Sequence, residues 1–114
     1  MEQAVQNKSF QFAVRIVKLC KYLREEKKEY ILTKQLLRSG TSIGANIVEA
    51  QQAQSKSDFV HKMSIALKEA AETAYWLRLL NATDYLSDKE MQSIAPECAE
   101  LEKLLTAIIK RVRE

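Results

Sequence analysis

The chain has 114 residues, of which 46% are hydrophobic and 29% are charged, a balance typical of a single folded domain over residues 1–114 and not of a disordered chain. Two glycines and one proline are too few for the many turns of a β-sandwich or a β-barrel, so long helices are predicted. The net charge of +3 does not by itself indicate nucleic acid, and no apolar run is long enough to predict a membrane span or a signal peptide, so a cytoplasmic protein is expected.

The first helix is predicted over residues 8–26. Its apolar residues recur at helical spacing from Phe12 to Leu23 and form one stripe that faces a core. A lone four-helix bundle buries one stripe per helix, so a second apolar set on the other side of this helix predicts an oligomer interface. That set consists of Phe10, Val14 and Val17. The charged run that follows, residues 24–29, is expected to be a solvated helix end or turn.

The second helix is predicted over residues 29–54, and it contains both glycines of the chain. Gly40 lies within the apolar stripe between Leu36 and Ile43, so the helix continues through it. Gly40 and Gly44 are four residues apart and are expected to form a groove in which the third helix packs closely. A phosphate-binding loop is the rejected alternative, because no strand precedes the glycines and the GK[ST] ending of such loops is missing.

Polar residues lie beside the apolar face of this second helix. Side chains at such positions are often half-buried and therefore need hydrogen-bond partners. We interpret them, together with the two glycines, as a helix-packing motif that fixes the register of the bundle. The alternative is a binding surface for another subunit or for a ligand. The polar members of the motif are Ser42, Asn46 and Glu49.

The third and fourth helices are predicted over residues 56–81 and 88–113. Each begins with a capping-box pattern, Ser55 with Asp58 and Ser87 with Glu90. Pro96 lies inside the fourth helical pattern and predicts either a kink or a restart of that helix. The short connections predict an all-α fold, an antiparallel up-down-up-down four-helix bundle.

Two further sets of apolar residues need a place in this bundle. The end of the third helix is apolar almost all round, and Trp76, Leu79 and Leu80 point away from its main stripe, which predicts a second part of the oligomer interface. Cys20 and Cys98 lie on apolar stripes and are interpreted as small core residues. A disulfide between them is the alternative, since antiparallel helices could bring them to similar heights, but a reducing cytosol argues against it.

Candidate catalytic or metal-binding residues are almost absent from the sequence. His61 is the one histidine, and it lies opposite the apolar stripe of its helix without further ligands at metal-binding spacing. A serine nucleophile would need that same histidine as its base. We therefore expect no catalytic residues, no metal and no cofactor, and we predict that the protein is not an enzyme.

Basic residues line one side of each of the first two helices. Lys8, Arg15 and Lys18 lie between the two apolar stripes of the first helix, with Tyr22 beside them. Lys34 and Arg38, which are four residues apart, lie on the outer side of the second helix. These five cations are the candidate nucleic-acid-binding residues, and ordinary solubilising charge is the alternative interpretation.

Three stretches of the chain resemble a known bacterial family. They are RSGTSIGANIVEA (residues 38–50), SKSDFVHKMSIALKEAAETAYWL (residues 55–77) and DYLSDKEM (residues 84–91). Together they are similar to the four-helix-bundle family of 23S-rRNA intervening-sequence proteins, over residues 10–112. Ser42, Asn46, Ile47 and Glu49 supply the SxxxNIxE core of the resemblance.

The resemblance carries its own expectations about assembly and partners. The family looks related to the accessory variability protein of diversity-generating retroelements, a basic pentameric barrel that binds nucleic acid and a reverse transcriptase. It implies a homo-oligomer, with a pentamer as the expected form, and a reverse transcriptase as one conceivable protein partner. Arg38 falls at the basic position of the family, whereas Gly44, Val48 and Ala50 stand where proline, alanine and glycine are usual.

Two hypotheses on function follow. The first is a non-enzymatic oligomeric bundle that binds RNA or DNA weakly through repeated basic surfaces, without any membrane partner. The second is an oligomeric adaptor that presents its helix faces to a protein and binds no nucleic acid.

Overall fold

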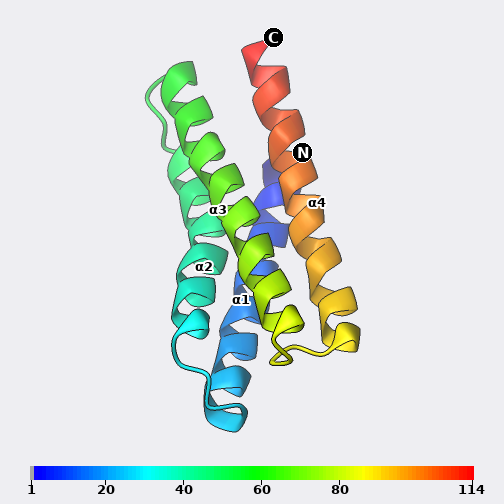
Figure 1. The fold of residues 1–114 in the computed structure, drawn as a ribbon. Coiled ribbons are helices and arrows are strands. Elements are labelled where there is room, and N and C mark those ends of the chain that lie inside the picture. Colours follow the sequence, from blue (N-terminus) through cyan, green and yellow to red (C-terminus); the bar gives the residue numbers. More distant parts are fainter. Residues whose placement is uncertain (1) are drawn as a thin grey trace.

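The computed structural model describes residues 2–114 and contains four helices and no strand in that range. The helices are α1 (Glu2–Glu26), α2 (Leu32–Ala50), α3 (Lys56–Ala82) and α4 (Asp88–Arg113). They lie side by side in a bundle 44 Å long and about half as wide (Figure 1). The predicted all-α, four-helix fold is confirmed. None of the helices within residues 2–114 has the length and apolarity that a membrane span requires.

The contacts between α1 and α2 show that these two helices are antiparallel. Ile16 of α1 lies against Gly40 of α2, whereas the earlier Ser9 lies against the later Gly44. Each helix packs against two others, and α1 and α3 lie on opposite sides of the bundle. Figure 1 shows each successive helix reversing the direction of the one before it.

One apolar core runs along the axis of the bundle. Each helix contributes a stripe with helical spacing, and each fully buried leucine, isoleucine or phenylalanine contributes roughly 1.5–3 kcal/mol to stability relative to an exposed one. The largest fully buried side chains are Phe12, Ile16, Leu23, Leu36, Ile43, Ile47, Met63, Leu77, Leu80, Leu86, Leu101 and Leu105.

The ends of α1 and α2 differ from the prediction. Helix α1 begins at Glu2 and not at residue 8, because Val5 and Ser9 are buried and extend its inward stripe by two turns. Helix α2 begins at Leu32 and ends at Ala50, and is therefore shorter than the predicted 29–54. The connection before it turns at Lys28, which has a positive φ of 57°.

Glu29 is a second correction, because it is not part of a solvated turn. It is only 7% exposed, and its carboxylate accepts hydrogen bonds from the backbone N–H groups of Ile31, Leu32 and Thr33 at 2.8–3.2 Å. Burial acts to raise the pKa of this carboxyl, but the hydrogen bonds from Leu32, Thr33 and Ile31 together outweigh burial and hold its pKa below the usual value. Glu29 thus satisfies the free donors at the start of α2.

The caps of α3 and α4 agree with the prediction in part. The Ser87 hydroxyl accepts from the N–H of Glu90, and the Glu90 carboxylate accepts from the N–H of Ser87, so this capping box is confirmed. At α3 the Ser55 hydroxyl accepts from the N–H of Asp58, but the Asp58 carboxylate accepts from Gln54 instead of Ser55. The capping box at the start of α3 is therefore only half formed.

Helix α4 continues through Pro96 from Asp88 to Arg113, so the predicted restart is wrong. Proline removes the donor that would bond the carbonyl of Gln92. Both residues are exposed, so water can hydrate that carbonyl and the helix need not break.

The groove formed by Gly40 and Gly44 receives α1, which corrects the expectation that α3 crosses there. A Cβ at Gly40 would lie 2.8 Å from Cγ2 and 2.9 Å from Cγ1 of Ile16. A Cβ at Gly44 would lie 3.4 Å from the hydroxyl oxygen of Ser9. The two glycines lie on the α1 side of α2, whereas α3 packs on the side that carries Ser39.

The two cysteines are free and buried, as the core interpretation predicted, and the disulfide alternative is wrong. The Cys20 thiol lies 3.5 Å from the carbonyl oxygen of Thr33, and the Cys98 thiol lies 3.3 Å from that of Ala70. Each cysteine therefore contacts a different neighbouring helix, and each thiol has its own acceptor.

Leu80 is completely buried, so its prediction as an interface residue is wrong. The chain folds back directly after α3: the N–H groups of Tyr85 and Leu86 donate to the carbonyl of Leu80, and Leu86 is itself buried. This connection covers the side of α3 that a helical wheel alone would place at the surface. Trp76 and Leu79 are half-buried, so they too expose less surface than predicted.

Candidate functional site

Three of the five predicted nucleic-acid-binding residues are paired with carboxylates. The Lys8 amine lies 3.2 Å from Glu100 of α4, and Arg15 forms an ion pair with Glu97 of the same helix. Arg38 is held by two carboxylates of α3. Such half-exposed pairs add little stability, but each carboxylate compensates a charge that a phosphate would otherwise meet. The predicted basic surface is thus largely neutralised at these positions.

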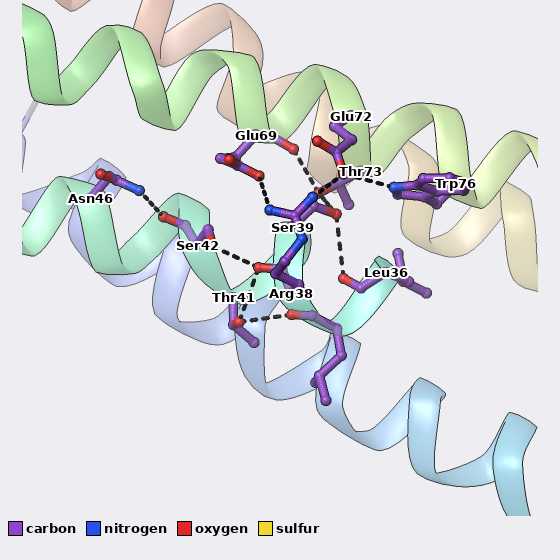
Figure 2. Close-up of polar contacts among 11 residues, drawn as sticks. Leu36, Arg38, Ser39, Thr41, Ser42, Asn46, Glu69, Glu72, Thr73 and Trp76 are labelled. Carbon is purple, nitrogen blue, oxygen red and sulfur yellow. Dashed lines mark hydrogen bonds and ion pairs between the residues drawn. The ribbon is translucent and has the colours of Figure 1, made fainter. Parts of the chain in front are cut away.

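Arg38 belongs to a polar cluster between α2 and α3 (Figure 2). Its guanidinium lies 3.6 Å from Glu69 and also pairs with Glu72, which accepts a hydrogen bond of 3.0 Å from the indole N–H of Trp76. The Trp76 bond is the main cause that lowers the pKa of Glu72; partial burial opposes it, and Arg38 adds to the lowering. Arg38 is therefore oriented toward α3 by an ionised carboxylate.

The polar members of the helix-packing motif contact mostly their own helix. Ser42 donates to the carbonyl of Arg38 at 2.7 Å, and Asn46 donates to the carbonyl of Ser42 at 2.8 Å (Figure 2). Glu49 alone of the three reaches α3, where it pairs with Lys62 at 2.9 Å. The hydrogen bonds of Ser42 and Asn46 are used within α2, and the charge of Glu49 is used by Lys62. These three side chains therefore do not converge on a common ligand site.

A buried polar contact joins α2 and α3. Ser39 lies among the polar residues beside the apolar face of α2, whereas its partner Thr73 was not singled out in the sequence. The hydroxyl oxygens of Ser39 and Thr73 lie 2.9 Å apart, and both residues are fully buried. A small hydroxyl on each helix lets the backbones approach while the polar groups remain satisfied. Ser39 directly precedes Gly40 on the inward side of α2, and this position was the signal in the sequence that could have predicted its burial.

A groove opens between α1 and α4, and two of the cations that line it have no such compensation. Within residues 2–114, neither Lys18 of α1 nor Lys89 of α4 forms an ion pair with a carboxylate. Lys34 is also exposed, on α2. The groove has a volume of about 500 Å³ and is lined by Arg15, Lys18, Leu19, Tyr22, Leu86, Lys89, Glu90, Ser93 and Ile94.

The position of this groove follows from the way α1 and α4 are joined. Arg15 donates to the carbonyl and hydroxyl oxygens of Ser93 and pairs with Glu97, which ties the helices together at that level. The two helices lie farther apart toward the end of the bundle that holds the α3–α4 connection (Figure 1). The structure thus brings two of the five predicted residues, Arg15 and Lys18, into one groove. Lys89, which shares that groove, was not predicted.

Glu90 is the one carboxylate among the residues that line the groove. The backbone N–H and then the hydroxyl of Ser87 lower the pKa of Glu90, against the effect of burial, and the charge of Lys27 adds to the lowering. Glu90 is therefore ionised and occupied in capping α4. Because Glu97 offsets Arg15, the two lysines against the one carboxylate of Glu90 leave the groove with a small positive charge.

The other side of α1 carries exposed apolar residues. Phe10 and Val17 are 69% and 48% exposed, and they follow directly the residues that contact Gly44 and Gly40. On α2, Leu37 lies one turn before Gly40 and the 60% exposed Val48 lies one turn after Gly44. The predicted exposure of the α1 residues is confirmed, and α2 extends the surface. We call it the α1/α2 apolar face: Phe10, Val14, Val17, Leu37 and Val48.

The two cysteine thiols and His61 are the next candidates for chemistry or metal binding. Burial raises the pKa of Cys20 to about 11 and that of Cys98 to about 12, so both thiols stay protonated. His61 is exposed, as predicted. Across residues 2–114, the acidic, histidine and cysteine side chains form no group of three or more that could hold a metal ion.

Comparisons with known proteins place the chain beside one family. Residues 1–107 match the family model described as 23S rRNA-intervening sequence protein. The chain is similar to a crystal structure of a protein of unknown function from the S23 ribosomal protein family of Bacteroides thetaiotaomicron VPI-5482, with 56% sequence identity and a TM-score of 0.95. The similarity covers 96% of this chain and 97% of that one. None of the curated proteins matches the chain.

Proposed function

Because the chain belongs to the 23S rRNA-intervening sequence protein family, we propose that it is a non-enzymatic protein that binds nucleic acid and acts as a homo-oligomer. The observation that carries the proposal is the pair of uncompensated cations, Lys18 and Lys89, on the rim of the positive α1/α4 groove. Phosphate contacts supply most of the affinity in non-specific binding, and these two amines share one groove in which a phosphate could contact both.

Binding by one subunit is expected to be weak. Two or three phosphate contacts release few counterions, so a single groove would hold nucleic acid only at low salt. An oligomer would repeat the groove on one particle, and binding at one groove would raise the effective concentration of the strand at the next. The proposal therefore needs self-association, for which the α1/α2 apolar face is the candidate surface.

The resemblance to the accessory variability protein makes a pentamer the subunit number we expect, and it makes a reverse transcriptase a conceivable partner. The adaptor hypothesis has lost part of its support, because Leu80 lies inside the core and Trp76 is half-buried. The exposed cations favour nucleic acid over a purely protein partner.

The test compares two double variants of equal charge by fluorescence anisotropy, with a labelled single-stranded RNA of about a dozen nucleotides at about 50 mM and about 200 mM salt. Lys18→Gln with Lys89→Gln removes the groove amines, and Lys56→Gln with Lys68→Gln removes two exposed amines of α3. We expect the first variant to lower the slope of log affinity against log salt by about 1.4, since each contact with a single strand contributes about 0.7.

The α3 variant is expected to bind almost as the wild type does. The proposal is wrong if the wild type fails to bind RNA at about 50 mM salt. It is also wrong if the two double variants weaken binding equally, because the effect would then be one of net charge and not of the groove.

A further inference from the structure

The α1/α4 groove combines an apolar wall with its cations, which phosphate binding alone does not require. Leu86 and Ile94 are buried and support the half-buried Leu19, while the ring of Tyr22 is 41% exposed beside them. A flat aromatic side chain at a positive groove is the combination with which proteins hold single-stranded nucleic acids, since bases stack on the ring while cations follow the backbone. A duplex offers phosphates but keeps its bases stacked inside.

The cations are arranged around this wall at one end of the molecule. Lys18 and Tyr22 are one turn apart on α1, and Lys89 lies opposite them near the start of α4. Arg15 closes the groove and is already oriented by Ser93 and Glu97, so it would lose little side-chain entropy on meeting a ligand.

The dimensions limit what the groove can hold. Its α1 wall runs from Arg15 to Tyr22, which is about 10 Å along a helix axis. An amphipathic peptide helix would need several turns of contact, whereas a single nucleotide fits within that length. The volume of about 500 Å³ lies within the usual range for a small-molecule site.

We infer that the α1/α4 groove holds one unpaired nucleotide of a single strand, with its base against Tyr22 and Leu19 and its phosphate between Lys18 and Lys89. The inference rests on the proposed function and names the part of the nucleic acid that this chain recognises. Because the groove lies on the side of α1 away from the α1/α2 apolar face, assembly through that face would leave one groove open per subunit.

The experiment uses the full chain and three RNA probes of about a dozen residues: an adenosine single strand, the same length of abasic sugar-phosphate, and a blunt duplex. We expect the wild type to prefer the single strand to both other probes by about tenfold, a typical contribution of one stacked base. Tyr22→Ala should lose that preference while its salt slope and its binding to the abasic strand stay unchanged. Tyr22→Phe should retain the preference, and since Tyr22 is partly exposed, circular dichroism should show that both variants fold.

The outcomes separate this inference from the proposed function. If the wild type binds all three probes equally and still depends on Lys18 and Lys89, the nucleotide inference fails and the proposed function stands. If it binds none of them, both fail. Adenosine monophosphate that binds as tightly as the single strand would make a free nucleotide the ligand, and an acidic amphipathic peptide that displaces RNA at equal concentration would favour a protein partner; either result overturns the inference.

Discussion

Gly40 lets α1 pack directly on the backbone of α2, and replacing it tests that contact. In Gly40→Ala the new methyl group would meet the branched part of Ile16 at 2.8–2.9 Å. The β-branched side chain of Ile16 has few alternative rotamers, so a backbone must move. Overpacking of this kind costs about 1–3 kcal/mol, against a gain of about 1 kcal/mol from helix propensity. We expect the free energy of unfolding in urea to fall by up to about 2 kcal/mol.

Gly44→Ala is the matched control for that replacement. The new methyl group would lie 3.4 Å from the hydroxyl of Ser9, which is an ordinary contact. The helix should therefore gain up to about 1 kcal/mol in stability from the better propensity of alanine. Equal destabilisation by the two alanines would mean that the α1–α2 contact at Gly40 is not as close as described.

Glu29 makes the stability of α2 depend on pH. Its folded-state pKa is lowered, so its contribution is fully present above the unfolded carboxyl pKa of about 4.3 and is lost as pH falls through the lower, folded pKa. At pH near 7, Glu29→Ala should reduce the free energy of unfolding by about 0.5–2 kcal/mol, as loss of a helix cap does. The difference from the wild type should shrink steadily on acidification below about pH 4.

The control for this measurement is Glu25→Ala, which removes an exposed carboxylate from the last turn of α1. It should change stability by less than about 0.5 kcal/mol at any pH. A Glu29→Ala deficit that persists unchanged into acid would show that the carboxylate charge is not what caps α2.

Between elements, the Ser39–Thr73 pair joins α2 to α3. We expect Ser39→Ala and Thr73→Val to be non-additive, because each removes the same contact of 2.9 Å between two buried hydroxyls. A double-mutant cycle followed by urea unfolding should give a coupling energy of about 0.5–1.5 kcal/mol. Additive effects would mean that the two hydroxyls act separately, through the carbonyls of Leu36 and Glu69 to which they also lie close.

Periodicity predicted the four elements well, and the bounds predicted for α3 and α4 agree with the structure to within one residue. The start of α1 and both ends of α2 were predicted poorly. The stripes of α1 to α4 can be read from the sequence because one face of each helix meets one core. Glu29 was missed because its carboxylate caps α2 from three residues before the helix, after a turn at Lys28 that no local pattern predicts. Leu80 was misplaced because the connection after α3 folds back over it.

The candidate site was only partly predictable for a related reason. The sequence shows that Lys8, Arg15 and Arg38 are basic, but it does not show which carboxylates lie beside them. Their acidic partners lie on other helices, and only the packing of the helices determines these pairs. Lys89 was missed for the same reason, since the basic residues that share its groove belong to α1. A helical wheel places charges around one helix and leaves open which charges of the next helix they meet.

At the scale of the whole molecule, the α1/α2 apolar face and the α1/α4 groove lie on different sides of α1. One side offers exposed apolar residues from two helices, and the other offers amines and an aromatic ring. A face that exposes Phe10 and Val48 to such a degree is typical of a surface that another subunit covers. Assembly through one side and ligand binding through the other would then be independent properties of the same helix.

The solution mass, measured by light scattering at micromolar concentration, tests the central claim most directly. The account predicts a wild-type mass that is a multiple of the 13.1 kDa chain, and a fall toward 13.1 kDa when Phe10→Ser and Val48→Ser interrupt the α1/α2 apolar face. Tyr75→Ser, which removes an exposed aromatic side chain from α3, should leave the wild-type mass unchanged. A wild-type mass of 13.1 kDa would contradict the account.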